Sequence, residues 1–183
     1  LVRARSRPPG RSEGARQAVQ CAAVIGRDFS YRLLGAVMVG EHYLEESVSE
    51  LEERELVNRV LSNNDGEFRF RHGLIQETVY NSLLVRRRET VHHKIAASIE
   101  SLYRDREEQT ERLAFHFAAS KDVERALPYL VHAGQRAANR FANEEALRYY
   151  RQSVDFMLKT MPAVEQRINV YAGLGSVQNF TGD

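Results

Sequence analysis

The chain has little of several residue types that catalytic and metal centres require. Its 183 residues include one cysteine, Cys21, and no tryptophan. A single thiol excludes an internal disulfide framework and a thiolate metal site, and it favours a reducing compartment. The longest apolar stretches, near residues 22–25 and 33–39, are far shorter than the ~20 residues of a membrane span. We therefore expect a cytoplasmic protein without a membrane segment.

Sequence motifs for nucleotide, metal and nucleophilic chemistry are also missing. The chain has no G-x-x-x-x-G-K-[ST] loop, no G-x-G-x-x-G after a predicted strand, and no G-x-S-x-G elbow. Its six histidines include no H-E-x-x-H motif and no pair four residues apart. The adjacent His92 and His93 would point about 100° apart on a helix, so they cannot share a metal. We predict no catalytic residue, no metal site and no cofactor in this fragment.

The charge balance argues against a general affinity for nucleic acid. Lysine and arginine number 26 and aspartate and glutamate 25, so the formal net charge is only +1. Residues 1–14 are rich in arginine, proline and glycine and show no apolar periodicity, which predicts a linker or a cut end. Because the chain begins with Leu1 and not with methionine, we expect it to start inside a longer protein.

Residues 15–104 show a mixed pattern. Residues 18–25 predict a buried helix that ends at Gly26, and Asp28 or Ser30 can cap a second helix through Val39. Apolar residues from Leu44 predict a third helix. Residues 56–61 and 67–71 then read as strands, joined by the turn-forming segment Asn63-Asn64-Asp65-Gly66. Three helices followed by a hairpin are typical of a winged helix.

Residues 105–183 predict a helical repeat that is truncated at its end. The segments 126–130 (ALPYL) and 146–150 (ALRYY) resemble each other at an offset of 20 residues. A tetratricopeptide repeat has a period of ~34 residues, so the resemblance to that repeat is loose. Small and large apolar residues at helical spacing suggest stacked helix pairs, and we predict a partner surface at Leu130, Tyr150 and Val154. The last helix, from residue 164, is expected to fray or self-associate.

Two basic sites could contact a phosphate. His72 lies between the second hairpin strand and an amphipathic helix, where it could sense an anion at the helix N-terminus. From the residues alone, a histidine hydrogen-bonded to a nearby carbonyl is the favoured interpretation. Arg86 and Arg87 open the next helix and could also hold a phosphate, although a solvated helix start is favoured there.

Three segments together resemble the STAND-type signal-transduction ATPases. They are residues 17–30 (QAVQCAAVIGRDFS), 68–80 (FRFRHGLIQETVY) and 137–150 (AANRFANEEALRYY). The resemblance is to the predicted ATPase region found with class III adenylate/guanylate cyclases and with large LuxR-type regulators. It implies an ATP- or ADP-binding AAA-type domain upstream in the same protein, a winged helix, and tetratricopeptide-like helices after it. It also implies that His72 contacts bound ADP, although Gly73 and Gln76 depart from the residues common beside that histidine.

These observations lead to one functional hypothesis and two alternatives. The hypothesis is a mainly α, non-catalytic regulatory segment that couples an upstream ATPase domain to a cyclase or a transcriptional effector through contacts of its helical repeat. One alternative is a DNA-binding winged-helix regulator. Residues 44–55, the candidate recognition helix, hold six glutamates and one arginine, which would repel a phosphate backbone. The other alternative is a helical-repeat scaffold that binds a protein or peptide.

Overall fold

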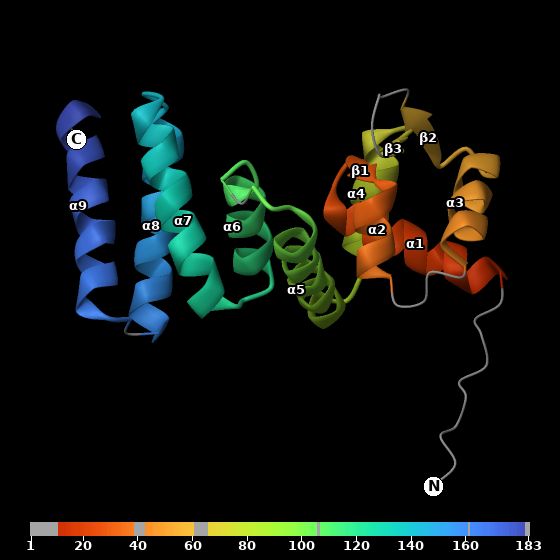
Figure 1. Ribbon diagram of the computed structural model, residues 1–183, viewed down its shortest axis with the longest axis horizontal. Coiled ribbons are helices and arrows are strands. Elements are labelled where there is room, and N and C mark those ends of the chain that lie inside the picture. The colour runs from red at the N-terminus through yellow and green to blue at the C-terminus, as the bar shows by residue number, and fades with distance from the viewer. Residues whose placement is uncertain (1–10, 39–42, 61–65, 106, 161, 182–183) are drawn as a thin grey trace, which may run out of the picture. The chain divides into compact units, whose positions relative to one another are not determined.

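The computed structural model describes residues 11–38, 43–60, 66–105, 107–160 and 162–181. Within these ranges the protein is mainly helical, as predicted, with nine helices and one small three-stranded sheet (Figure 1). The chain divides into two compact units, Leu1–Val91 and His92–Asp183, and the division falls inside helix α5 (Val85–Leu102). The sequence-based boundary between residues 104 and 105 lies just beyond that helix. None of the helices in these ranges is long and apolar enough to cross a membrane.

The first unit contains the sheet and the helices around it. Its elements are α1 (Arg11–Ile25), β1 (Asp28–Ser30), α2 (Tyr31–Val37), α3 (Leu44–Glu53), β2 (Val57–Val60), β3 (Glu67–Phe70) and α4 (Gly73–Ser82). The three predicted helices and both hairpin strands are therefore present. Ser30 is one of the two predicted caps of α2. Its Oγ accepts a hydrogen bond of 3.1 Å from the Leu33 N–H. The predicted end of α2 at Val39 and Gly40 lies outside the described residues.

Helix α1 is longer than the sequence predicts. It starts at Arg11, so residues 11–14 are helical and do not belong to the linker expected for residues 1–14. Residues 1–10 of that segment lie outside the described ranges. The extension has a tertiary cause, because α1 packs against α3 and a side chain at Gly14 would meet Ser47 Oγ at 2.7 Å. The helix ends before Gly26, whose φ of 145° requires glycine, as predicted.

Strand β3 is the centre of the sheet and pairs antiparallel with both β1 and β2. Its alternating sequence buries Phe68 and Phe70, which are 1% and 0% exposed. Phe29 of β1 stands opposite Phe68, and its ring centroid lies 5.7 Å from each of the two other rings. The aromatic contacts thus hold β1 against the hairpin. Strand β1 has only three residues and one apolar side chain, so no periodicity predicted it.

The turn between β2 and β3 is described only at its end. Gly66 has φ of 59°, the left-handed conformation that the predicted turn requires. The Gly66 carbonyl also accepts a hydrogen bond of 2.9 Å from the Tyr31 N–H, which ties the turn to the start of α2. The other predicted turn residues, Asn63, Asn64 and Asp65, lie outside the described residues.

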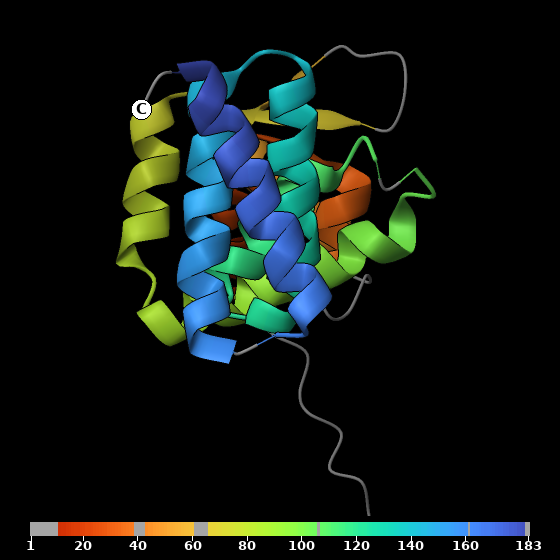
Figure 2. The ribbon, with the colours of Figure 1, turned by 90° about the vertical axis from the view of Figure 1, so that its left-hand side faces the viewer.

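The second unit is a succession of helices. After the end of α5 it contains α6 (Thr110–Ala119), α7 (Val123–Asn139), α8 (Asn143–Thr160) and α9 (Val164–Thr181). From α6 onward each helix packs on the next, and α7 also contacts α9 (Figure 2). Helices α7 and α8 bury the residues that match at the 20-residue offset: Ala126, Leu127 and Leu130 in one, and Ala146, Leu147 and Tyr150 in the other. The sequence similarity therefore reflects two helices that bury the same positions.

Tyr150 is the largest fully buried side chain of the second unit, with 1% of its surface exposed. Its ring lies against backbone on two sides. A methyl group on Gly134 of α7 would lie 3.0 Å from Tyr150 Cζ, and one on Gly173 of α9 would overlap the same ring. Glycine at these two positions thus allows α7 and α9 to approach the ring closely. Gly173, the first residue of the Gly-Leu-Gly segment at residues 173–175, accordingly serves helix packing.

Candidate functional site

His72 occupies the junction between strand β3 and helix α4. It is the N-cap residue of α4, with φ of −130° and ψ of 136°, and its carbonyl accepts a hydrogen bond of 3.0 Å from the Ile75 N–H. Its imidazole makes no capping hydrogen bond, and the residue is exposed. The backbone of His72 therefore initiates the helix, while the residue remains exposed.

The first turn of α4 leaves room beside His72. A side chain at Gly73 would have no neighbour within 4 Å, and Leu74 is 75% exposed. The first N–H groups of a helix lack partners within the helix and carry a partial positive charge. An imidazole and free N–H groups can together contact an anion. The residues alone favoured a hydrogen bond between the His72 ring and a nearby carbonyl. Among the described residues the structure provides no such carbonyl partner.

Gln76 fixes the position of this first turn. Its Nε2 donates a hydrogen bond of 2.6 Å to the carbonyl of Ala23, in the last turn of α1. Carbonyls in the last turn of a helix lack a partner within that helix, so the Gln76 amide satisfies one of them. Gln76 stands where the resembled family often has a basic residue. The structure gives this residue a role in joining α4 to α1, and hence in placing His72.

We expect Gln76→Ala to lower the free energy of unfolding of the first unit by about 1 kcal/mol, the usual contribution of one such hydrogen bond. Gln76→Glu should cost more, because a carboxylate has no donor and would face the negative end of α1. Urea unfolding followed by circular dichroism measures both. A Gln76→Glu variant as stable as the wild type would show that this hydrogen bond does not hold α4.

The two arginines with a predicted phosphate contact lie at the other end of α4. Arg86 and Arg87 are exposed in the first turn of α5. The ten residues of α4 separate them from His72, which corresponds to about 15 Å along the helix axis. His72 and these arginines therefore cannot bind the same phosphate group. The neighbouring Arg88 instead stacks on Tyr80, with its guanidinium carbon 5.0 Å from the ring centroid.

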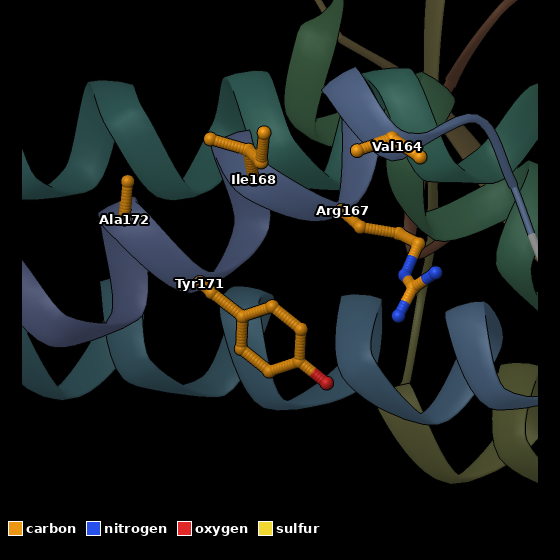
Figure 3. A pocket seen from close by; sticks show the side chains of 5 residues that line it. All are labelled: Val164, Arg167, Ile168, Tyr171 and Ala172. Atoms are coloured by element: carbon orange, nitrogen blue, oxygen red, sulfur yellow. The ribbon is translucent and has the colours of Figure 1, made fainter.

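The residues predicted as a partner surface lie mostly in the interior. Leu130 and Tyr150 are each 1% exposed, and Val154 is half-buried. Leu130 and Tyr150 cannot contact a partner while α7, α8 and α9 are packed together, so they are core residues in this structure. Helical spacing identified the apolar face of each helix but could not show that neighbouring helices cover it. The large apolar residues that this unit exposes are Phe115, Phe141 and Leu158, and Val164, Ile168 and Tyr171 on α9 (Figure 3).

Two buried histidines that the sequence analysis did not connect lie side by side. His92 on α5 and His116 on α6 are 1% and 2% exposed, and their Nδ1 atoms are 2.9 Å apart. One Nδ1 must donate the hydrogen and the other must accept it, so at least one of the two rings has to be neutral. They are 24 residues apart on different helices, and no spacing rule could have paired them.

The surroundings of this pair disfavour positive charge. Burial, followed by the neighbouring His92 and by Arg112, lowers the pKa of His116 from 6.5 to about 3. The ring of Phe115 lies at the edge of both imidazoles, with centroids 5.4 Å from His92 and 5.0 Å from His116. Within the described ranges no group of three or more His, Cys, Asp or Glu side chains is arranged to hold a metal ion. His92 and His116 therefore form a buried hydrogen bond, and the surroundings of His116 favour its neutral form.

Comparison with known proteins relates the chain to part of a longer protein. An uncharacterized protein of Rhizobium meliloti (strain 1021) is 29% identical over 148 residues, which cover 77% of this chain and 14% of that protein. The chain thus spans about a seventh of the length of this relative. No family model matches the chain, and no solved structure matches it.

Proposed function

We propose that this chain is a non-catalytic regulatory segment of a multidomain, cytoplasmic signalling ATPase of the STAND type. It would couple the nucleotide state of an upstream ATPase domain to a cyclase or a transcriptional effector. ATP or ADP would be bound by that upstream domain, and this chain would contact the nucleotide through one histidine. The helical repeat would carry the contacts with a protein partner.

The element order of the first unit supports the winged-helix part of this proposal. Helices α1, α2 and α3 precede the hairpin of β2 and β3, which would be the wing. Strand β1, between the first two helices, joins the hairpin as a third strand. In this interpretation α4 follows directly from the wing. A contact made by a residue at the β3–α4 junction would therefore depend on the position of the whole domain.

The second unit supports the helical-repeat part. Helices α6 to α9 pack in sequence, and α7 and α8 start with the same pattern of buried residues at an offset of 20. Each of these two helices follows a residue in the left-handed conformation, Lys121 with φ of 62° and Phe141 with φ of 60°. Repeated helices with repeated turns are what a tetratricopeptide-like array needs. Such an array presents helical surfaces to proteins more readily than to small molecules.

The charge of α3 disfavours the alternative of a DNA-binding regulator. In a winged helix the third helix would enter the major groove, and α3 exposes Glu45, Glu46 and Glu53. Its one following basic residue, Arg54, is already paired with Glu50 at 2.6 Å. An acidic helix would be repelled by the phosphates on both sides of the groove.

The exposed ring of His72 at the β3–α4 junction is the observation that carries the proposal. In the longer parent protein, His72→Ala is expected to weaken ADP binding and raise basal output by about ten- to a hundred-fold. The reason is the loss of one charge-assisted hydrogen bond in the ADP-bound state, about 1.5–3 kcal/mol. Isothermal titration calorimetry with ADP and an assay of the effector output measure the two effects.

The exposed His132 on α7 offers a matched control for this experiment. His132→Ala removes an exposed imidazole of the second unit and should leave ADP affinity and output unchanged. The 183-residue chain alone should bind ADP weakly, because it lacks the phosphate-binding loop. Unchanged ADP affinity and output in His72→Ala would refute the proposed sensor role.

A further inference from the structure

The short connection between α4 and α5 exposes two apolar residues directly before two arginines. Helix α4 ends at Ser82 and α5 begins at Val85. Leu84 and Val85 are 80% and 56% exposed, and Arg86 and Arg87 after them are exposed as well. These four consecutive residues, 84–87, are called the LVRR segment here. They bring large apolar side chains and guanidinium groups together on one small surface.

The chain is fixed on both sides of the LVRR segment. Before it, Leu83 is only 6% exposed, and its N–H donates a hydrogen bond of 3.2 Å to the Tyr80 carbonyl. After it, Arg88 is half-buried, and its guanidinium carbon lies 5.0 Å from the centroid of the Tyr80 ring. The segment is therefore held in place while its own side chains stay exposed. Binding a partner would require little further ordering of the backbone.

The stability of α5 does not explain the two exposed arginines. No ion pair joins Arg86 or Arg87 to another residue of the described ranges, and the first turn of α5 holds no acidic residue. The first acidic residue of this helix, Glu89, follows that turn and is half-buried. Positive side chains in a first turn are repelled by the helix dipole, so they destabilise a helix slightly. The two charges are therefore available to a negatively charged partner.

The apolar half of the segment favours a lipid surface over a protein helix as that partner. Leu84 precedes α5 and Val85 is its first residue, and neighbours in sequence do not share one helix face. A partner helix therefore cannot cover both along a single stripe. The boundary between lipid headgroups and acyl chains is fluid, so it can accommodate two adjacent apolar side chains that point in different directions. Headgroup phosphates at the same boundary accept hydrogen bonds from guanidinium groups.

We propose that the LVRR segment binds an anionic membrane surface. Leu84 and Val85 insert at the acyl boundary, and Arg86 and Arg87 contact headgroup phosphates. One basic residue near an anionic surface strengthens binding about fivefold, and two strengthen it about thirty-fold. Together with two apolar side chains, this gives half-saturation at on the order of 1 mM accessible lipid, which is a reversible attachment. The contact is independent of nucleotide sensing at His72, and each proposal can fail without the other.

Sedimentation of the 183-residue chain with lipid vesicles tests the binding. At about 1 mM lipid, about half of the chain should sediment with phosphatidylcholine vesicles that contain about one third phosphatidylglycerol, and almost none with phosphatidylcholine alone. Arg86→Gln with Arg87→Gln should weaken binding about thirty-fold and leave only a few per cent of the chain bound. Arg86→Lys with Arg87→Lys keeps both charges and should retain most of the binding.

A second double variant controls for the loss of net charge. Arg27→Gln with Arg151→Gln removes the same two charges from exposed positions elsewhere in the chain and should bind like the wild type. Three results would each overturn the proposal: no binding to the anionic vesicles, equal binding to phosphatidylcholine alone, or an equal loss in the two glutamine variants.

Tryptophan fluorescence tests whether the apolar side chains enter the lipid. The chain has no tryptophan, so a single introduced one is the only indole that reports. The emission of Leu84→Trp should shift to the blue when anionic vesicles are added, because the indole leaves water for the acyl boundary. Leu74→Trp, at the 75% exposed leucine in the first turn of α4, should show no shift. Binding that depends on Arg86 and Arg87 but leaves the Leu84→Trp emission unchanged would indicate a purely ionic contact, such as an acidic protein makes, and would refute membrane insertion.

Discussion

Replacing Tyr150 with alanine is expected to lower the free energy of unfolding of the second unit by about 3–5 kcal/mol. The ring is 1% exposed and lies between the backbones of Gly134 and Gly173. Removing it would open a cavity where α7, α8 and α9 meet. Glycines on two sides of this cavity have no side chains that could move in to fill it, so the loss should lie near the upper end for an aromatic residue.

Tyr150→Phe is the matched control for this prediction. It keeps the ring and removes only the hydroxyl, whose hydrogen bond to Gln135 Oε1 is long, at 3.4 Å. We expect this variant to lose less than about 1 kcal/mol. Urea unfolding followed by circular dichroism measures the sum over both units, and hydrogen exchange of α8 and α9 assigns the change to the second unit. A Tyr150→Ala variant within about 1 kcal/mol of the wild type would show that the ring does not hold these helices together.

The second unit is expected to lose stability steadily as the pH falls below about 6.5. Burial and the neighbouring His92 lower the pKa of His116 from 6.5 to about 3 in the folded chain. Between these two values the unfolded chain binds a proton that the folded chain does not, so acid favours unfolding. One such group reduces the free energy of unfolding by up to about 1.4 kcal/mol per pH unit, or close to 3 kcal/mol at pH 4.5.

Two histidine variants separate this effect from general acid sensitivity. His116→Phe removes the titrating group, so its unfolding free energy should depend less on pH between 6.5 and 4.5, whatever its value at neutral pH. His132→Gln removes an exposed histidine of α7 and should keep the wild-type dependence. Urea unfolding at several pH values gives the slopes. Equal slopes for His116→Phe and the wild type would mean that another group causes the acid sensitivity.

The sequence was sufficient to predict the elements that have a strong local signal. The alternation of apolar and charged residues around Phe68 and Phe70 predicted a half-buried strand. The φ of Gly66 agrees with the turn predicted to precede that strand. Apolar spacing predicted the helices, and the similarity of residues 126–130 and 146–150 predicted two equivalent helices, whose matching residues the structure shows to be buried. It also placed His72 at the junction of a strand and a helix. Each of these features depends on neighbours within a few residues along the chain.

Only the tertiary structure decided which apolar faces are covered and which distant residues meet. Leu130 and Tyr150 have the same helical pattern as Val164 and Ile168, yet the first two are core and the last two are exposed. Helical spacing shows that a face is apolar, but coverage depends on whether another helix packs there. Tertiary packing also brings His92 to His116 and Gln76 to Ala23, and it explains the early start of α1 against α3. Their contacts join segments far apart in the chain, so no local periodicity carries a signal for them.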